Sequence, residues 1–285
     1  MKILALFTLV LCTVSISYGQ TKDSAASTKL VAPWWVEKFK FTAGLFVPVN
    51  NTKIQVGANG AADGTEIDFQ KDLGFGASVV TFLANFQWRI SRRSRVNVAY
   101  FNMSRNATHT LQKDINFNDQ TYPVDASVNS YFNTSIYQFS YGYAIIEKPT
   151  YEVGLMIGAH TVGAKTGIAL NGMSTGASKD NNFGFTAPLP DLGVWGGYAF
   201  NNRFAVNLDF DYLSLTVDKI NGRIIAYNMI FSYKLIRQLD ISLAYSGLNF
   251  NIKTTKNDVT GEFKWGYNGP VLGATFSFGK KSWVN

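Results

Sequence analysis

The chain has 285 residues, a formal net charge of +7 and a single cysteine. Cys12 lies in the N-terminal apolar segment, which excludes disulfides, a cysteine nucleophile and a zinc–cysteine site from the sequence beyond it. The basic residues are scattered and form no stripe, so we expect no nucleic-acid partner.

The N-terminus has the features of an export signal. Met1 and Lys2 precede an apolar run from Ile3 to Ile16, and small residues follow at Ser17 and Gly19. We expect cleavage after Gly19, a periplasmic lead-in over residues 20–35 and one barrel domain over residues 36–285. The apolar run is shorter than the roughly 20 residues that a membrane-spanning helix needs, and no other run reaches that length.

Beyond the lead-in, short segments alternate apolar and polar residues, which is typical of β-strands with two different faces. Between Phe204 and Tyr212, for example, the even positions are apolar, whereas Asn207, Asp209 and Asp211 lie between them. The pattern predicts strands at Val36 to Val49, Ala77 to Ile90, Arg95 to Met103, Val128 to Ile146, Tyr151 to Val162, Pro190 to Phe200, Phe204 to Val217, Arg223 to Lys234, Leu239 to Phe250, and Val271 to Phe278.

The connections between these strands alternate in length. The predicted tight turns are Ser91 to Ser94, Glu147 to Thr150, Asn201 to Arg203, and Leu235 to Gln238. The predicted loops at the other end are Asn50 to Gly76, Ser104 to Ser127, Gly163 to Leu189, Asp218 to Gly222, and Asn251 to Pro270, of which the fourth is short. Short periplasmic turns and longer extracellular loops are typical of a transmembrane, antiparallel, up-and-down β-barrel. About ten strands are expected, with eight or twelve left open.

The apolar face of the strands is predicted to contact lipid, because aromatic and aliphatic side chains occupy it. An Arg or Lys at mid-membrane on this face costs roughly 2–4 kcal/mol. The alternative is a soluble barrel or sandwich, which would bury these side chains in a core. The predicted lipid-facing residues include Phe39, Phe41, Leu45, Val80, Phe82, Phe86, Trp88, Tyr137, Phe139, Tyr141, Leu155, Ile157, Val194, Tyr198, Ile225, Tyr227, Met229, Phe231, Ile241, Leu243, Tyr245, Leu272, Phe276 and Phe278. An interfacial aromatic belt is expected at Trp34, Trp35, Trp88 and Tyr151.

Several segments resemble small outer-membrane β-barrel proteins of Gram-negative bacteria, including a largely uncharacterised family within the OmpA/OmpW-like set. They are Arg92 to Tyr100, Asp114 to Phe117, Thr186 to Pro190, and Gly266 to Pro270. The resemblance implies an outer-membrane location and contact with outer-membrane lipid, lipopolysaccharide and the barrel-assembly machinery. One departure is that such barrels commonly end on an aromatic residue, whereas Gly279 to Asn285 follow Phe278 here; either the assembly signal is internal or Trp283 contributes.

The inward faces of the strands carry charges of both signs. In a narrow barrel they can meet across the lumen, and an unpaired charge is costly there, so we expect mutual pairing. The alternative is a polar conduit or ligand site lined by the same side chains. The residues of this predicted lumen network are Lys40, Arg89, Arg95, Glu152, Asp209, Asp211, Lys234 and Asp240.

Little in the sequence favours catalysis. His109 is expected in a long loop and His160 at the outer end of a strand, and neither belongs to an Asp-x-His or His-x-Ser arrangement. Gly172 to Gly176 lacks the ending of a P-loop, and the acidic residues from Asp63 to Asp72 do not reproduce an EF-hand. We therefore predict no catalytic residue, cofactor or metal.

The sequence thus predicts a non-enzymatic, integral outer-membrane barrel. It would be a narrow channel or a binder of small or hydrophobic molecules, with the ligand unidentified. The alternatives are a barrel enzyme that acts on lipid or peptide, and a loop-mediated adhesin or structural barrel.

Overall fold

The computed structural model describes residues 32–58, 65–117, 120–171, 182–217, 220–256 and 259–279. The predicted signal peptide, most of the lead-in, Gly172 to Gly176 and Trp283 lie outside these ranges. In the part that is described, no helix is long and apolar enough to cross a membrane.

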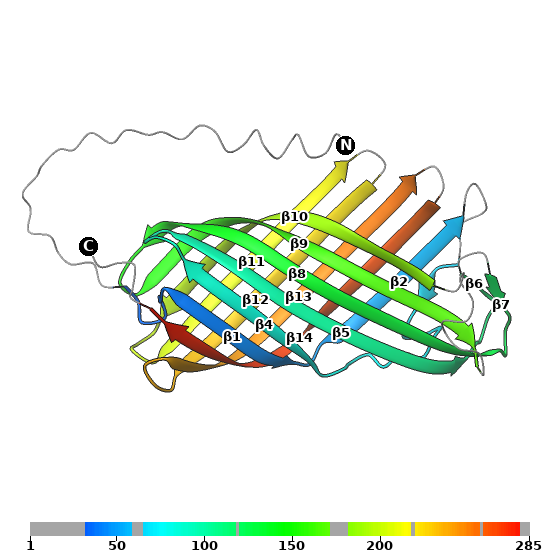
Figure 1. The fold of residues 1–285 in the computed structure, drawn as a ribbon, viewed down its shortest axis with the longest axis horizontal. Helices are drawn as coiled ribbons and strands as arrows, with labels where there is room; N and C mark the ends of the chain where they lie inside the picture. The colour runs from blue at the N-terminus through cyan, green and yellow to red at the C-terminus, as the bar shows by residue number, and fades with distance from the viewer. Residues whose placement is uncertain are drawn as a thin grey trace, which may run out of the picture.

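The fold is a closed antiparallel β-barrel, as Figure 1 shows. Among the described residues ten strands form its wall, which confirms the predicted fold class. In the order of their pairing they are β1 (Phe39–Phe46), β4 (Thr81–Arg89), β5 (Ser94–Thr110), β8 (Ser127–Glu147), β9 (Tyr151–Leu170), β10 (Asn182–Ala199), β11 (Phe204–Val217), β12 (Ile220–Lys234), β13 (Leu239–Lys256) and β14 (Val259–Phe278), and β14 pairs with β1.

The first strand of the wall is broken and resumes as β2 (Val49–Ala58). The inner half of β14 pairs with β1, and its outer half pairs with β2. Pro48 lies in the break, where it has no N–H to donate to a ladder. The remaining strands are β3 (Ile67–Asp68), which pairs with β2, and the hairpin of β6 (Ile115–Phe117) and β7 (Gln120–Tyr122).

Most strands are longer at their outer ends than the sequence predicts. β8 has 21 residues and β9 has 20, whereas a tilted strand crosses the hydrocarbon layer with about 9–11. Segments predicted as loops are therefore partly strand: β5 continues to Thr110, β9 continues to Leu170 and β14 begins at Val259. The barrel extends well beyond the membrane on the side opposite the tight turns.

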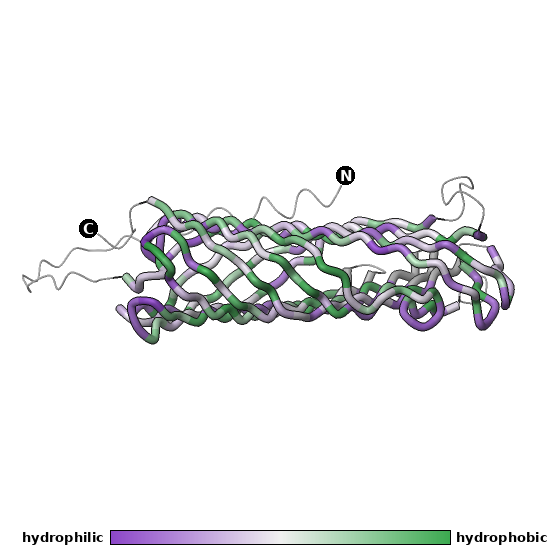
Figure 2. The backbone as a smooth tube through the Cα atoms, turned by 90° about the horizontal axis from the view of Figure 1, so that it is seen from below, coloured by the Kyte–Doolittle hydropathy of each residue, from purple (hydrophilic) through white to green (hydrophobic). Residues whose placement is uncertain are grey.

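The reason is that the apolar face changes sides partway along the barrel. In β8, Phe139 is 55% exposed on the outside, while Ser140 is buried inside. Further along the same strand, Phe132 is buried inside and Asn133 is exposed outside. The alternation continues without a break, but the apolar side chains now face the interior. The half of the barrel next to the tight turns (the inner half) therefore has the pattern of a membrane barrel. The half next to the loops (the outer half) has the apolar interior of a soluble barrel. In Figure 2 hydrophilic residues are frequent in the loops at both ends.

The predicted lipid-facing residues lie on the outer surface. Phe39, Ile225 and Tyr227 are half-buried, and the others are exposed. An exposed apolar band of this extent is typical of a lipid-facing surface. The interfacial assignment of Trp35 is wrong, because only 4% of this side chain is exposed.

Candidate functional site

The interior of the membrane-spanning half contains the residues of the predicted lumen network. Arg89 of β4 and Glu152 of β9 are both fully buried and form a two-fold hydrogen-bonded ion pair, with Nη1 donating to Oε1 at 3.0 Å and Nη2 donating to Oε2 at 2.7 Å. Arg89 also donates to the carbonyl oxygen of Arg92 at 2.9 Å. The pair joins two strands that are not neighbours in the sheet and so braces the barrel across its lumen.

A second ion pair lies beside the first. Nη2 of Arg95 donates to Oδ1 of Asp209 at 3.0 Å, and the guanidinium carbon lies 3.6 Å from the ring centre of Trp195. A side chain at Gly154 would collide with the indole of Trp195, so this glycine makes room for it. The stacked cation and the ion pair together hold Arg95 in one orientation.

The other members of the network are less directly paired. Lys234 stands opposite Asp240 in the register of β12 and β13, and its Nζ lies 5.4 Å from the ring centre of Trp34. Lys40 faces the lumen, and in the described chain no carboxylate lies within ion-pair distance of it. Asp211 is buried, and its Oδ1 has no hydrogen-bond partner among the described residues. The lumen therefore contains ionic groups beyond its two closed pairs.

Sequence analysis missed a buried histidine–carboxylate pair. His160 lies in the middle of β9 with its side chain inside the barrel, and not at the end of a strand as predicted. Its Nδ1 is 2.7 Å from Oδ2 of Asp191 in β10. The two residues are 31 positions apart in sequence, and the pairing of Gly158 with Asp191 brings them together. No short motif signals such a pair.

His109 is also in a strand and not in a loop. It lies near the outer end of β5, and its ring packs against Gly74. Gly74 has a φ of +68°, a conformation that glycine adopts readily, and an added Cβ would lie 2.7 Å from Nδ1 of His109. His109 and His160 are thus at different levels of the barrel and do not share a site.

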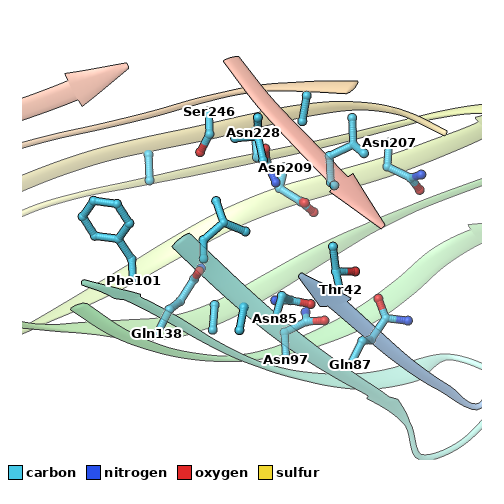
Figure 3. Close-up of a pocket in the computed structure, with 18 of the residues that line it drawn as sticks. Thr42, Asn85, Gln87, Asn97, Phe101, Gln138, Asn207, Asp209, Asn228 and Ser246 are labelled. Atoms are coloured by element: carbon cyan, nitrogen blue, oxygen red, sulfur yellow. The ribbon is translucent and has the colours of Figure 1, made fainter. Parts of the chain in front are cut away.

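A chamber of about 220 Å³ lies in the lumen next to the Arg95–Asp209 ion pair. This space can hold a small organic molecule or on the order of ten water molecules. His160, Lys40 and Asp209 line it, together with a larger set of neutral polar side chains. In Figure 3 these amides and hydroxyls project from opposite walls; they include Thr42, Asn85, Gln87, Asn97, Gln138, Asn207, Asn228 and Ser246.

The outer side of the chamber is apolar. Phe46, Phe101 and Tyr267 line it, with ring centres 5.0 Å apart for Phe101 and Tyr267. They belong to a cluster of buried hydrophobic residues that continues into the outer half of the barrel. The chamber thus has polar walls and an aromatic ceiling, which suits a molecule with one polar and one apolar part.

β3 and the segment that follows it lie inside the outer half of the barrel, and we call residues 67–76 the plug. Phe69, Leu73 and Phe75 of the plug are buried, and the ring of Phe69 lies 5.5 Å from that of Phe132 in β8. Because β8 does not pair with β2 or β3 in the sheet, this contact places the plug inside the barrel.

Arg105 of β5 fixes the plug from inside the barrel. Its Nη2 donates to Oγ1 of Thr52 at 2.7 Å, and its Nη1 donates to the carbonyl oxygen of Gly76 at 3.4 Å. The guanidinium also lies between two rings, 5.3 Å from the centre of Phe75 and 5.2 Å from that of Phe132. One buried cation thus connects β2, the plug and the ring of Phe132 on the neighbouring strand β8.

The periplasmic end is covered by the segment before β1. Trp35 and Val36 are buried against Ala199 and Ala205, which lie at the tight turn between β10 and β11. A side chain at Gly197 would collide with Trp35, so the glycine admits the indole to the mouth of the barrel. Only the last residues of the predicted lead-in are described, and they pack on the barrel.

The described residues contain no group of three or more side chains that suits a metal ion. In the acidic segment, Asp68 and Asp72 accept backbone hydrogen bonds, and Asp72 pairs with Lys113 at 2.9 Å. Asp63 lies outside the described residues.

No protein-family model and no curated protein matches the chain. Among solved structures, the outer membrane protease OmpT from Escherichia coli matches with a TM-score of 0.52 at 11% identity, covering 84% of this chain and 97% of OmpT. The attachment invasion locus protein Ail from Yersinia pestis matches with 0.36 at 11% identity, over 85% and 99% of the two chains. The toluene transporter TodX from Pseudomonas putida matches with 0.34 at 10% identity, over 88% and 94%. At this identity the likeness to OmpT is one of fold alone.

Proposed function

We propose that this outer-membrane β-barrel is a non-enzymatic protein that holds a small amphipathic molecule in its lumen. The observation that carries the proposal is the chamber, whose walls present amide and hydroxyl groups and whose ceiling is aromatic. Binding sites of this kind orient a ligand by a few polar groups and gain affinity from the apolar surface that they cover.

A steady open pore fits the interior less well than a binding chamber. The plug fills the lumen on the outer side, and Trp35 packs into the periplasmic mouth. Ten strands also leave a narrow lumen that side chains can fill to a large extent. Passage of a molecule would require the plug to move.

One observation favours the second candidate, an enzyme in the lumen. A histidine whose Nδ1 is held by a carboxylate is a common form of an oriented general base. Both side chains are almost completely buried, which also fits a structural pair that satisfies two buried polar groups. Surface attachment through the outer loops stays a third candidate.

The test uses purified, folded barrel in detergent and in planar bilayers. We expect no steady conductance, together with saturable binding of single-ring phenols, indoles or aryl amides in ligand-observed NMR. Replacement of Gln138 by Leu should weaken binding about two- to tenfold through the loss of one hydrogen bond, whereas Asn102→Leu on the outer surface should not. A steady current, or equal binding by both variants, would contradict the proposal.

A further inference from the structure

The outer surface of the barrel carries a row of basic and amide side chains on four adjacent strands. β12, β13, β14 and β2 lie side by side in Figure 1. Their registers place Arg223 opposite Asn251, Asn251 opposite Lys264, and Lys264 opposite Lys53. We call these four residues the basic row. Because neighbouring strands are about 4.8 Å apart, the row is compact enough to contact one headgroup.

The basic row lies just above the lipid-facing band. Four positions closer to the membrane in the register, Tyr227 pairs with Gly247, and the exposed ring of Tyr245 lies 6.4 Å from that of Tyr227. The hydroxyl of Tyr245 donates a hydrogen bond to Oδ1 of Asn268 at 2.7 Å, as expected for an aromatic ring at the membrane–water interface. The cations of the row are therefore at the level of the headgroups of the outer leaflet.

Between the basic row and these rings, the surface is hollowed. The hollow measures about 340 Å³, and Asn51, Asn249 and Gly266 line it together with the row. Gly266 has no side chain, and the amides of Asn51 and Asn249 stand on either side of it in the register. The hollow thus combines hydrogen-bond donors with positive charge.

Three carboxylates lie near the lysines of the row: Asp68 stands opposite Lys53 at 3.9 Å, and the other two lie further from the membrane. Glu66 is 3.1 Å from Lys53 and 4.0 Å from Lys264, and Glu262 is 3.1 Å from Lys264. Glu262 also accepts from Nδ2 of Asn251 at 2.9 Å. By contrast, no carboxylate in the described chain lies within ion-pair distance of Arg223, which is exposed. Among the described residues, Arg223 is therefore the cation of the row that has no paired carboxylate, whereas Asp68, Glu66 and Glu262 pair with the lysines.

We propose that the hollow beneath the basic row binds the phosphate of a lipid headgroup in the outer leaflet. Arg223 and Lys264 contact the phosphate, and the amides of Asn51 and Asn249 donate to its oxygens. The acyl chains then lie along the exposed aromatic and aliphatic side chains below. Basic residues next to a membrane surface attract anionic headgroups, and a guanidinium matches a phosphate with two parallel hydrogen bonds. This inference is independent of the ligand in the lumen.

The experiment compares the full chain with Arg223→Gln/Lys264→Gln and with Lys165→Gln. Lys165 is an exposed lysine on β9, away from the row, and serves as the matched control. Each protein is purified in detergent, checked for folding by heat-modifiable mobility, and examined by native mass spectrometry with added bis-phosphorylated lipid A, its dephosphorylated form, phosphatidylglycerol or inorganic phosphate.

We expect retention of one phosphorylated lipid by the wild type and by Lys165→Gln, and about tenfold weaker retention by the double variant. The dephosphorylated lipid should be retained weakly, and to the same extent, by all three proteins. Lipid A and phosphatidylglycerol distinguish the two sources of lipid phosphate. Equal retention by the double variant, equal loss in Lys165→Gln, or equally tight binding of inorganic phosphate alone would overturn the proposal.

Discussion

Arg89 and Glu152 form an ion pair inside the membrane-spanning half of the barrel, with both side chains fully buried and two hydrogen bonds of 3.0 and 2.7 Å between them. The residues are 63 positions apart and belong to β4 and β9. In the low dielectric of the lumen each charge depends on the other, because neither has access to bulk water.

Removal of one partner of this pair should destabilise the barrel strongly. Glu152→Leu leaves Arg89 buried without its counter-charge, and the expected loss in the free energy of unfolding is about 3–5 kcal/mol. The double variant Arg89→Met/Glu152→Leu should recover most of this loss, since it removes both charges. Urea titration of the folded band on unboiled gels measures the effect; equal stability of the single and double variants would argue against a coupled pair.

Because the apolar face of the strands changes from the outside to the inside along the barrel, the same substitution should have different effects at two positions of β5. Val98 and Asn106 are both exposed on the outer surface. Val98→Arg places a charge against lipid and should cost roughly 2–4 kcal/mol, whereas Asn106→Arg should be nearly neutral. The amount of folded protein in outer-membrane fractions, with urea titration, measures both. Similar costs at the two positions would show that the boundary is misplaced.

Arg105→Ala should loosen the plug. It removes the contacts with Thr52, Gly76 and the two rings, and it leaves the apolar packing of Phe69 and Phe75 in place. We expect faster hydrogen exchange in residues 67–76 than in the wild type, and intermittent single-channel current where the wild type should give none.

Lys113→Ala is the matched control for the plug. Its ion pair with Asp72 connects the same segment to the loop between β5 and β6, but the lysine side chain is 48% exposed, and such pairs contribute about 0–1 kcal/mol. This variant should stay electrically silent. A silent Arg105→Ala with unchanged exchange would show that the apolar contacts alone hold the plug.

His160→Gln separates the structural reading of the His160–Asp191 pair from the enzymatic one. For the proposed binding barrel we expect unchanged lipid composition and unchanged proteolysis in cells. The free energy of unfolding should fall by about 1–3 kcal/mol if Asp191 loses its buried partner. A change in lipid or peptide processing at normal protein levels would instead favour the enzyme.

The sequence by itself determined the inner half of the barrel. Alternation in segments such as Phe204 to Val217 predicts strands, and the bounds of that strand agree with β11. The tight turns and the lipid-facing residues also follow from the sequence, because contact with lipid on one side and a polar lumen on the other imposes one pattern on every strand.

The outer half was not predictable in this way. From Phe132 outward along β8 the apolar side chains face inward, so the same alternation has the opposite meaning, and segments read as loops are strands. Whether the apolar residues of a strand face lipid or the interior depends on where the strand leaves the membrane. Strand tilt and register set that position.

Only the tertiary structure decided which buried groups meet. The sequence suggests charges in the lumen, but it does not indicate which of them pair. That Glu152 pairs with Arg89, that His160 pairs with Asp191 and that Arg105 anchors the plug is known only from the structure. These partners lie on different strands, and closure of the barrel brings them together. The alternation of apolar and polar residues is local, because it follows from lipid on one face of a strand and a polar lumen on the other. Pairing across the lumen instead depends on how the sheet closes.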